Sequence, residues 1–147
     1  MSKNPHADKA AACFEEGFSC SQAVLATYSE MFGLNRERAL KLSQAFGGGM
    51  ARMGETCGAL TGAFMVIGLK YGRIRAEDEA ARDKTYGLVL EFVRRFKARN
   101  GSIVCKELIG QDMSTPEGLK MAHDSQVIQT RCPGFIRAAA EILDEIL

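Results

Sequence analysis

Apolar residues recur along this chain at intervals of three and four, the spacing that places side chains on one face of an α-helix. The interval is clearest over 76–100, where Ala81, Leu88, Phe92 and Phe96 share a face. No stretch sustains the alternation of apolar and polar residues that marks a half-buried strand. The pattern therefore predicts that the chain is helical throughout.

Residues that favour helix ends divide this pattern into segments. Asn, Ser or Thr stands where its side chain can cap a first turn, and glycine stands where a helix must stop. These signals predict helices over 5–16, 20–32, 36–46, 56–71, 76–100 and 103–109, a seventh that opens at Thr115-Pro116, and a last one that opens at Cys132-Pro133. Because 147 residues fit one domain, we expect an all-α, single-domain bundle of seven to eight helices over residues 1–147.

Composition and charge exclude several classes of protein. A hydrophobic fraction of 46% and a charged fraction of 25% are ordinary globular values that exclude a disordered chain. A formal net charge of +1 gives no overall field for nucleic acid or an anionic membrane. The longest apolar run, 57–69, is too short to span a bilayer, and the amino-terminal segment lacks the apolar stretch of a secretory signal. We expect a soluble, cytoplasmic protein that binds no nucleic acid, is not membrane-embedded and can form a homodimer.

Cysteine usage is the unusual feature of the composition. An odd number of cysteines, five, at long spacings does not fit a secreted disulfide scaffold. Cys13 lies inside a predicted helix and is expected to be a buried packing residue. Free backbone N–H groups and the helix dipole favour a thiolate at the amino-terminal turn of a helix. Four of the cysteines fall at such a predicted position: Cys20, Cys57, Cys105 and Cys132.

Glycines recur in the same part of the sequence as Cys57. Gly54, Gly58 and Gly62 are spaced every fourth residue, which makes a ridge that another helix or a cofactor can approach closely. Gly58 and Gly62 are therefore candidate cofactor contacts, with tight helix packing as the alternative, which is favoured for Gly62. Gly49 and Gly54 resemble the start of a phosphate loop, but glutamate stands where that loop needs lysine, so we expect no nucleotide site.

Other polar residues give weaker signals. Arg52 could pair with an anionic substrate or a thiolate, although an exposed loop cation is the simpler interpretation. His6 and His123 are isolated in the sequence and are expected at the surface. The chain has no C-x-x-C-H segment, so covalently attached haem is not expected.

Taken together, the cysteine and glycine positions give a sequence that resembles the C_GCAxxG_C_C family of redox-active proteins, which are helical chains of similar size. The matching segments are GFSCSQAV around Cys20, CGALTG from Cys57, SIVCKELIG around Cys105 and RCPGF around Cys132, while Cys13 lies outside the pattern. The middle segment reads C-G-A-x-x-G, so its first letters differ in order from the family name. The resemblance implies redox activity at these four cysteines. Some relatives are associated with a haem or an iron–sulfur cluster, and members are often encoded beside transporters.

Three uses of the four cysteines stay open. They could hold a [2Fe–2S] cluster for electron transfer, with helix N–H groups tuning its potential. They could work as dithiol/disulfide couples that exchange with a redox partner protein or a small molecule. They could bind a structural zinc ion, although such sites usually draw their ligands in close pairs. The spacings of 37, 48 and 27 residues require tertiary folding to assemble any of these sites. We rank the first two equally and zinc below them.

A protein of a different class is the alternative. The chain could be a non-catalytic helical interaction module, attached to a membrane transporter, in which the cysteines only pack or bind structural zinc. Convergence of the four sulfur atoms on one pocket would favour the redox hypothesis, and dispersed sulfur atoms would favour the module.

Overall fold

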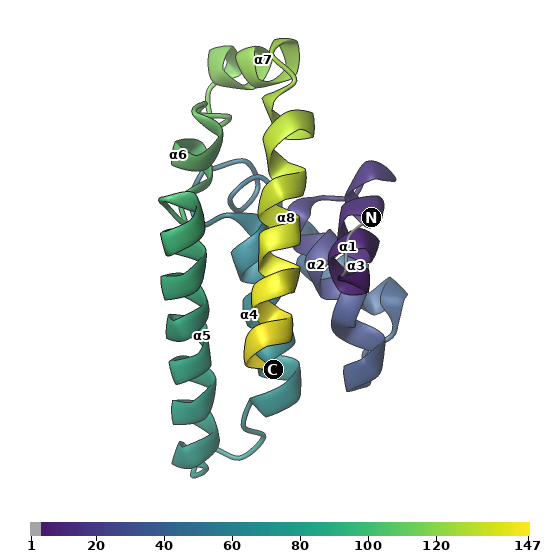
Figure 1. Ribbon diagram of the computed structural model, residues 1–147, viewed down its shortest axis with the longest axis vertical. Coiled ribbons are helices and arrows are strands. Elements are labelled where there is room, and N and C mark those ends of the chain that lie inside the picture. Colours follow the sequence, from purple (N-terminus) through teal and green to yellow (C-terminus); the bar gives the residue numbers. More distant parts are fainter. Residues whose placement is uncertain (1–3) are drawn as a thin grey trace.

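Eight α-helices follow one another along residues 4–147, the part of the chain that the computed structural model describes (Figure 1). They are α1 (Pro5–Glu15), α2 (Cys20–Ser29), α3 (Arg36–Ser43), α4 (Gly58–Tyr71), α5 (Glu79–Asn100), α6 (Cys105–Ile109), α7 (Pro116–Asp124) and α8 (Val127–Ile146), with 3₁₀ turns η1 (Glu30–Phe32) and η2 (Gln44–Phe46). These residues contain no β-strand, which confirms the predicted all-α fold. Within the same range, no helix has the length and hydrophobicity needed to cross a membrane.

Side-chain caps set where several helices begin. Four helices begin with a side chain that accepts a hydrogen bond from a backbone N–H of the first turn: Asn4 at α1, Ser19 at α2, Asn35 at α3 and Thr115 at α7. At α2 the side chain of Gln22 also accepts from the backbone N–H of Ser19, which completes a capping box. These four starts agree with the sequence prediction because a cap acts within a single turn of backbone.

The core forms around α2, which packs against α1, α3, α4 and α8. α2 and α4 approach closely because Gly62 has no side chain, and a Cβ there would lie 2.8 Å from the carbonyl oxygen of Ser21. This contact accounts for Gly62 through helix packing. α5 and α8 both pack against α4 and run along the long axis of the molecule (Figure 1). The largest side chains that are fully buried in this core are Tyr28, Phe92 and Phe96.

His6 is half-buried and joins α1 to α8, whereas the sequence analysis placed it at the surface. Its Nδ1 lies 2.8 Å from Oδ1 of Asp144. The hydroxyl group of Tyr28 lies 2.9 Å from the same carboxylate oxygen and 2.9 Å from the carbonyl oxygen of Ala140. Burial, together with the negative charge of Asp144, raises the pKa of Tyr28, so its hydroxyl group stays protonated and can donate.

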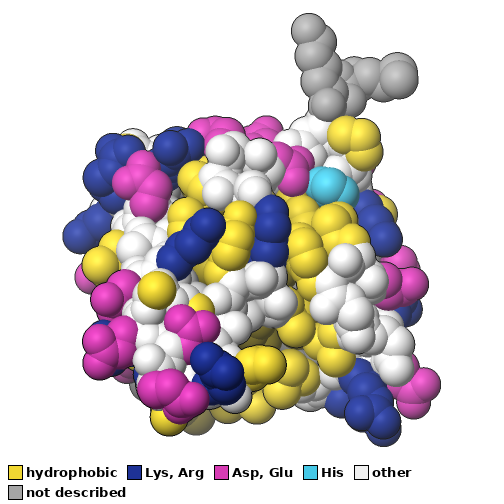
Figure 2. Space-filling model, turned by 90° about the horizontal axis from the view of Figure 1, so that it is seen from below, with side chains coloured by type: hydrophobic (Ala, Val, Ile, Leu, Met, Phe, Trp, Pro, Cys, Tyr) yellow, Lys and Arg dark blue, Asp and Glu magenta, His cyan; other side chains and the backbone are white. Residues whose placement is uncertain are grey.

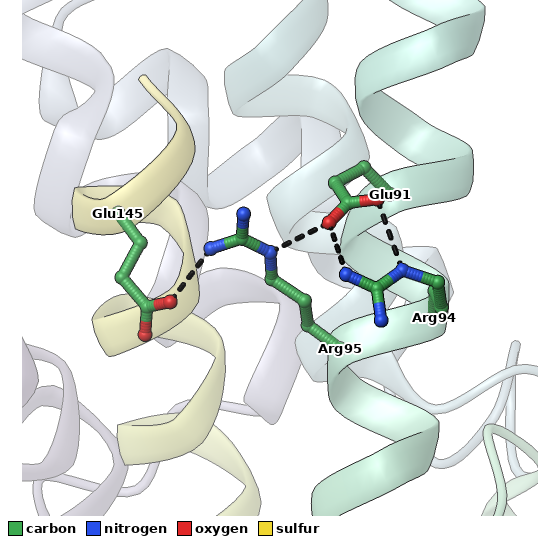
Figure 3. A network of polar contacts seen from close by, with 4 residues as sticks. All are labelled: Glu91, Arg94, Arg95 and Glu145. Atoms are coloured by element: carbon green, nitrogen blue, oxygen red, sulfur yellow. Dashed lines mark hydrogen bonds and ion pairs between the residues drawn. The ribbon is translucent and has the colours of Figure 1, made fainter.

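Arg95 links α5 to α8 through a carboxylate on each helix (Figure 3). Its Nε donates to Glu91 on α5 at 2.8 Å, and its Nη1 donates to Glu145 on α8 at 2.7 Å. Arg94 donates to Glu91 as well, and the hydrogen bonds from Arg94 and Arg95 lower the pKa of Glu91 to about 2. Glu91 and Arg95 are half-buried, whereas Arg94 and Glu145 are exposed, so solvent weakens these ion pairs and their contribution to stability is modest.

The end of the bundle where α4 passes into α5 carries exposed apolar surface. Viewed from below, hydrophobic side chains extend across this face, with Lys and Arg side chains among them and further charged side chains around the rim (Figure 2). The connection between the two helices includes Ile74, which is 98% exposed. Apolar surface therefore remains outside the main core.

α8 begins at Val127, earlier than predicted, and both Cys132 and Pro133 lie inside it. The prediction that Cys132-Pro133 opens this helix is wrong. Pro133 lacks an N–H and leaves one carbonyl of the preceding turn without an intrahelical donor. Tertiary packing holds that turn in place, because Val127 and Ile128 contact an apolar cluster formed by α6, α7 and α8.

Candidate functional site

A pocket of about 1040 Å³ opens where the start of α2, the loop before α4, α6, α7 and the first half of α8 meet. Cys20, Cys57, Cys105 and Cys132 all line it, and all are free thiols. Cys13 lies instead in the main core, with Nη2 of Arg36 4.0 Å from its sulfur. The structure therefore brings together the four predicted cysteines and leaves the fifth apart.

A short antiparallel bridge places Cys57 beside Cys105. Thr56 pairs with Val104, and each cysteine follows one member of that pair. The N–H of Cys57 donates to the carbonyl of Ile103 at 2.8 Å, and the N–H of Cys105 donates to the carbonyl of Glu55 at 2.6 Å. Since side chains alternate across extended backbone, both cysteines point to the same side of the bridge, away from Thr56 and Val104.

Gly58 brings the start of α4 against the start of α2. A Cβ at Gly58 would lie 2.9 Å from the backbone nitrogen of Ser21 and 3.2 Å from the Cβ of Cys20. The close approach predicted at this glycine is therefore made by α2. Gly58 also lines the pocket, whereas Gly62 lies between α2 and α4.

The thiols of Cys20 and Cys132 line the same pocket, and each shifts the pKa of the other. The S–H of Cys20 favours the thiolate of Cys132, which lowers the pKa of Cys132. The same interaction, together with burial, raises the pKa of Cys20. Two thiols that interact in this way lose the first proton more readily than the second.

The other two thiols of the pocket are held in the protonated state. Burial raises the pKa of Cys57 to about 12 and that of Cys105 to about 11. The backbone N–H groups of Ala59 and Leu60 contact the sulfur of Cys57 and oppose this rise, as expected at a helix start. At Cys57 desolvation outweighs these N–H contacts, and at Cys105 burial and the charge of Cys132 both raise the pKa, so the predicted preference for a thiolate is not found at either.

The loop that forms one wall of the pocket contains a left-handed turn. Five consecutive residues, 48–52, have φ between 50° and 68°, and three of them are not glycine: Met50, Ala51 and Arg52. Gly49 lies directly against the site, because a Cβ there would be 2.7 Å from the Cβ of Cys105. Such a run is uncommon because a side chain in this conformation crowds the following carbonyl group. The run of glycines predicts a loop here, but no local pattern indicates its handedness.

The remaining walls are mostly apolar, with a few charged groups among the exposed lining residues. Arg52 and Glu15 are exposed at the pocket. His123 is exposed, as predicted, but it also lines the pocket, which the sequence analysis missed because nothing in the sequence links it to a cysteine. The apolar part of the lining comes chiefly from Phe14, Phe18, Leu108, Ile109, Met113, Leu119, Ile128 and Phe135.

The described residues contain no preformed site for a single metal ion. Among residues 4–147, no three His, Cys, Asp or Glu side chains are placed so that they could hold one. A four-thiolate zinc site requires four sulfur atoms around one centre, at about 2.3 Å from it. The structural zinc hypothesis therefore has no support in this arrangement.

Comparison with known proteins connects these residues to a family. The family described as "Putative redox-active protein (C_GCAxxG_C_C)" matches residues 18–146, a range that contains all four pocket cysteines and excludes Cys13. No curated protein matches the chain, and no solved structure does. The family match covers nearly the whole chain, and the chain therefore belongs to the C_GCAxxG_C_C family.

Proposed function

We propose that the protein is a thiol–disulfide redox protein in which Cys20 and Cys132 form the working couple. The observation that carries this proposal is that Cys20 and Cys132 line one pocket and shift each other's pKa, with that of Cys132 lowered. A dithiol couple needs two sulfur atoms within reach of each other and one thiol that ionises readily. The shared pocket and the lowered pKa of Cys132 support these requirements for the pair, and membership of the family supports redox activity in general.

In the proposed reaction, the thiolate of Cys132 attacks one sulfur of a substrate disulfide. A new S–S bond joins Cys132 to that sulfur, the substrate bond breaks, and the departing thiolate takes up a proton from water. Cys20 then loses its proton to water and attacks Cys132, which forms the Cys20–Cys132 disulfide and releases the second substrate thiolate. The second substrate thiolate takes up a proton from water. Counting the proton that Cys132 lost when it became the attacking thiolate, the protein gives up two electrons and two protons, and the substrate disulfide becomes two thiols.

The other two pocket thiols have a different place in this proposal. Cys57 and Cys105 stay protonated at neutral pH because burial raises the pKa of each. They are therefore poor nucleophiles, since the thiolate is the reactive form. The redox partner is a protein or small molecule that carries a disulfide, and we place the reaction in the cytoplasm, where the couple would be kept reduced.

Oxidised glutathione is a suitable probe of the couple, read by intact-protein mass spectrometry. The reduced wild-type protein should lose two free thiols without retaining glutathione, because Cys20 resolves the mixed disulfide. Cys20→Ser should retain one covalently bound glutathione at Cys132. Cys132→Ser should react at least about tenfold more slowly, because each unit of pKa changes the thiolate fraction tenfold. Cys13→Ser is the matched control and should behave as the wild type.

Two other outcomes would overturn the proposal. Anaerobic treatment with iron and sulfide could produce a stable visible absorption that each of the four Cys→Ser variants abolishes, which would favour a [2Fe–2S] centre. A colourless protein whose thiol count stays the same across redox buffers would favour the non-catalytic module.

A further inference from the structure

α5 stands at one edge of the bundle and leaves one of its faces uncovered (Figure 1). Its neighbours α4 and α8 pack against the opposite side, where Phe92 and Phe96 are fully buried. The uncovered residues recur at intervals of three and four, which places them in one row. This row, called the α5 face below, consists of Glu79, Asp83, Tyr86, Gly87, Leu90, Arg94 and Lys97, all of them exposed.

The centre of the α5 face is apolar. Tyr86 is 61% exposed and Leu90 is 69% exposed, and they lie one turn apart. Gly87 lies beside them, inside a helix, where glycine is less favourable than alanine by about 1 kcal/mol. A Cβ at Gly87 would meet nothing within 4 Å, so packing within the chain does not require this glycine. Because glycine has no side chain, another helix can approach α5 closely at this position.

Charge is ordered along the same face. Its amino-terminal end carries the acidic residues Glu79 and Asp83, and its carboxy-terminal end carries the basic residues Arg94 and Lys97. Arg94 binds Glu91 within the chain but leaves 67% of its side chain exposed. The face is therefore acidic, then apolar, then basic, and it is complementary to itself when reversed.

We propose that the α5 face binds the α5 face of a second copy of this chain, with the two helices antiparallel about a two-fold axis near residue 88. In this register Tyr86 of one copy faces Leu90 of the other, Glu79 faces Lys97, and Asp83 faces Arg94. Each of these contacts occurs twice, as an isologous dimer requires. Gly87 lies close to the axis, where the helices are nearest.

The small size of this interface sets the affinity expected of the dimer. A single pair of helices buries little surface, so the association is at the weak end of specific interfaces, with a dissociation constant in the micromolar range. Replacing Leu90 with a charged residue affects the interface twice, once for each copy. Loss of two buried leucine side chains should weaken association by at least about 100-fold.

Sedimentation velocity over a concentration series tests this interface. The wild-type protein should shift from monomer towards dimer as concentration rises, and Leu90→Glu should remain monomeric. Leu42→Glu is the matched control, because Leu42 is 57% exposed on α3, away from this face. A wild-type protein that stays monomeric throughout, or an equal effect of the two glutamate variants, overturns the proposal.

Charge reversal tests the antiparallel register. One variant carries Glu79→Lys and Asp83→Lys, and the other carries Arg94→Glu and Lys97→Glu. Each face then has a single sign of charge, so neither variant should associate with itself. A mixture of the two should associate, because each end then meets its opposite charge. Circular dichroism confirms that both variants are folded, and a folded mixture that fails to associate refutes the register.

Discussion

Replacing Gly49 with alanine should destabilise the protein by about 1–5 kcal/mol. Gly49 has a φ of 68°, a conformation that costs alanine about 1–2 kcal/mol. The new Cβ would lie 2.7 Å from the Cβ of Cys105 and 2.7 Å from the backbone nitrogen of Glu55. Overpacking of this kind typically costs about 1–3 kcal/mol. Alanine also restricts the unfolded chain more than glycine does, which offsets about 0.4–1 kcal/mol of this destabilisation.

Urea denaturation, followed by circular dichroism, measures this loss. Gly134→Ala is the matched control, because Gly134 lies inside α8 and a Cβ there would meet nothing within 4 Å. That variant should be more stable than the wild type by about 0.5–1 kcal/mol, since alanine favours a helix over glycine. The two Gly→Ala substitutions should therefore change the free energy of unfolding in opposite directions.

The alkylation rate of Cys105 gives a second readout for Gly49→Ala. Because the added methyl group pushes directly on this residue, its thiol should become more accessible to iodoacetamide. An unchanged urea midpoint together with unchanged alkylation would show that the loop does not lie against Cys105 as described, and the reasoning would be wrong.

Three further predictions concern ionisation and hydrogen bonding. The pH profile of iodoacetamide labelling should show Cys132 reacting with a midpoint below 9 and Cys57 with a midpoint near 12; coincident midpoints would contradict the site description. Tyr28→Phe removes a buried donor and should lower the free energy of unfolding by about 1–2 kcal/mol, as measured in urea. The folded-state pKa of Glu91 lies below its ordinary value, so its interactions stabilise the fold above about pH 4.5 and are lost as pH falls towards 2. Nuclear magnetic resonance titration of this carboxylate should show a midpoint near 2, and an ordinary midpoint would refute the network.

The parts of the fold that are decided within one turn of backbone could be predicted from the sequence. Ser19 and Asn35 cap helices at the predicted positions because the hydrogen bond that each makes is local. Pro133 misled the prediction because proline favours the first turn of a helix, whereas here tertiary packing of Val127 extends α8 in front of it.

The site itself was only partly predictable. The sequence identified Cys20, Cys57 and Cys105 near helix starts, and the structure places them there. Their proximity depends on long-range contacts, such as the bridge between Thr56 and Val104, which no local pattern specifies. A position at a helix start predicts a lowered pKa for Cys57, but burial raises it, and the depth of burial is a tertiary property that no local pattern specifies.

Cys20 and Cys132 bring the first and last parts of the chain to one pocket. About 110 residues separate the two, so a covalent bond between them would close about three quarters of the chain into a ring. For a ring of roughly 100 residues, the reduced freedom of the unfolded chain corresponds to about 4.7 kcal/mol. Oxidation would then stabilise the folded state, and the oxidised form would resist proteolysis and thermal unfolding better than the reduced form.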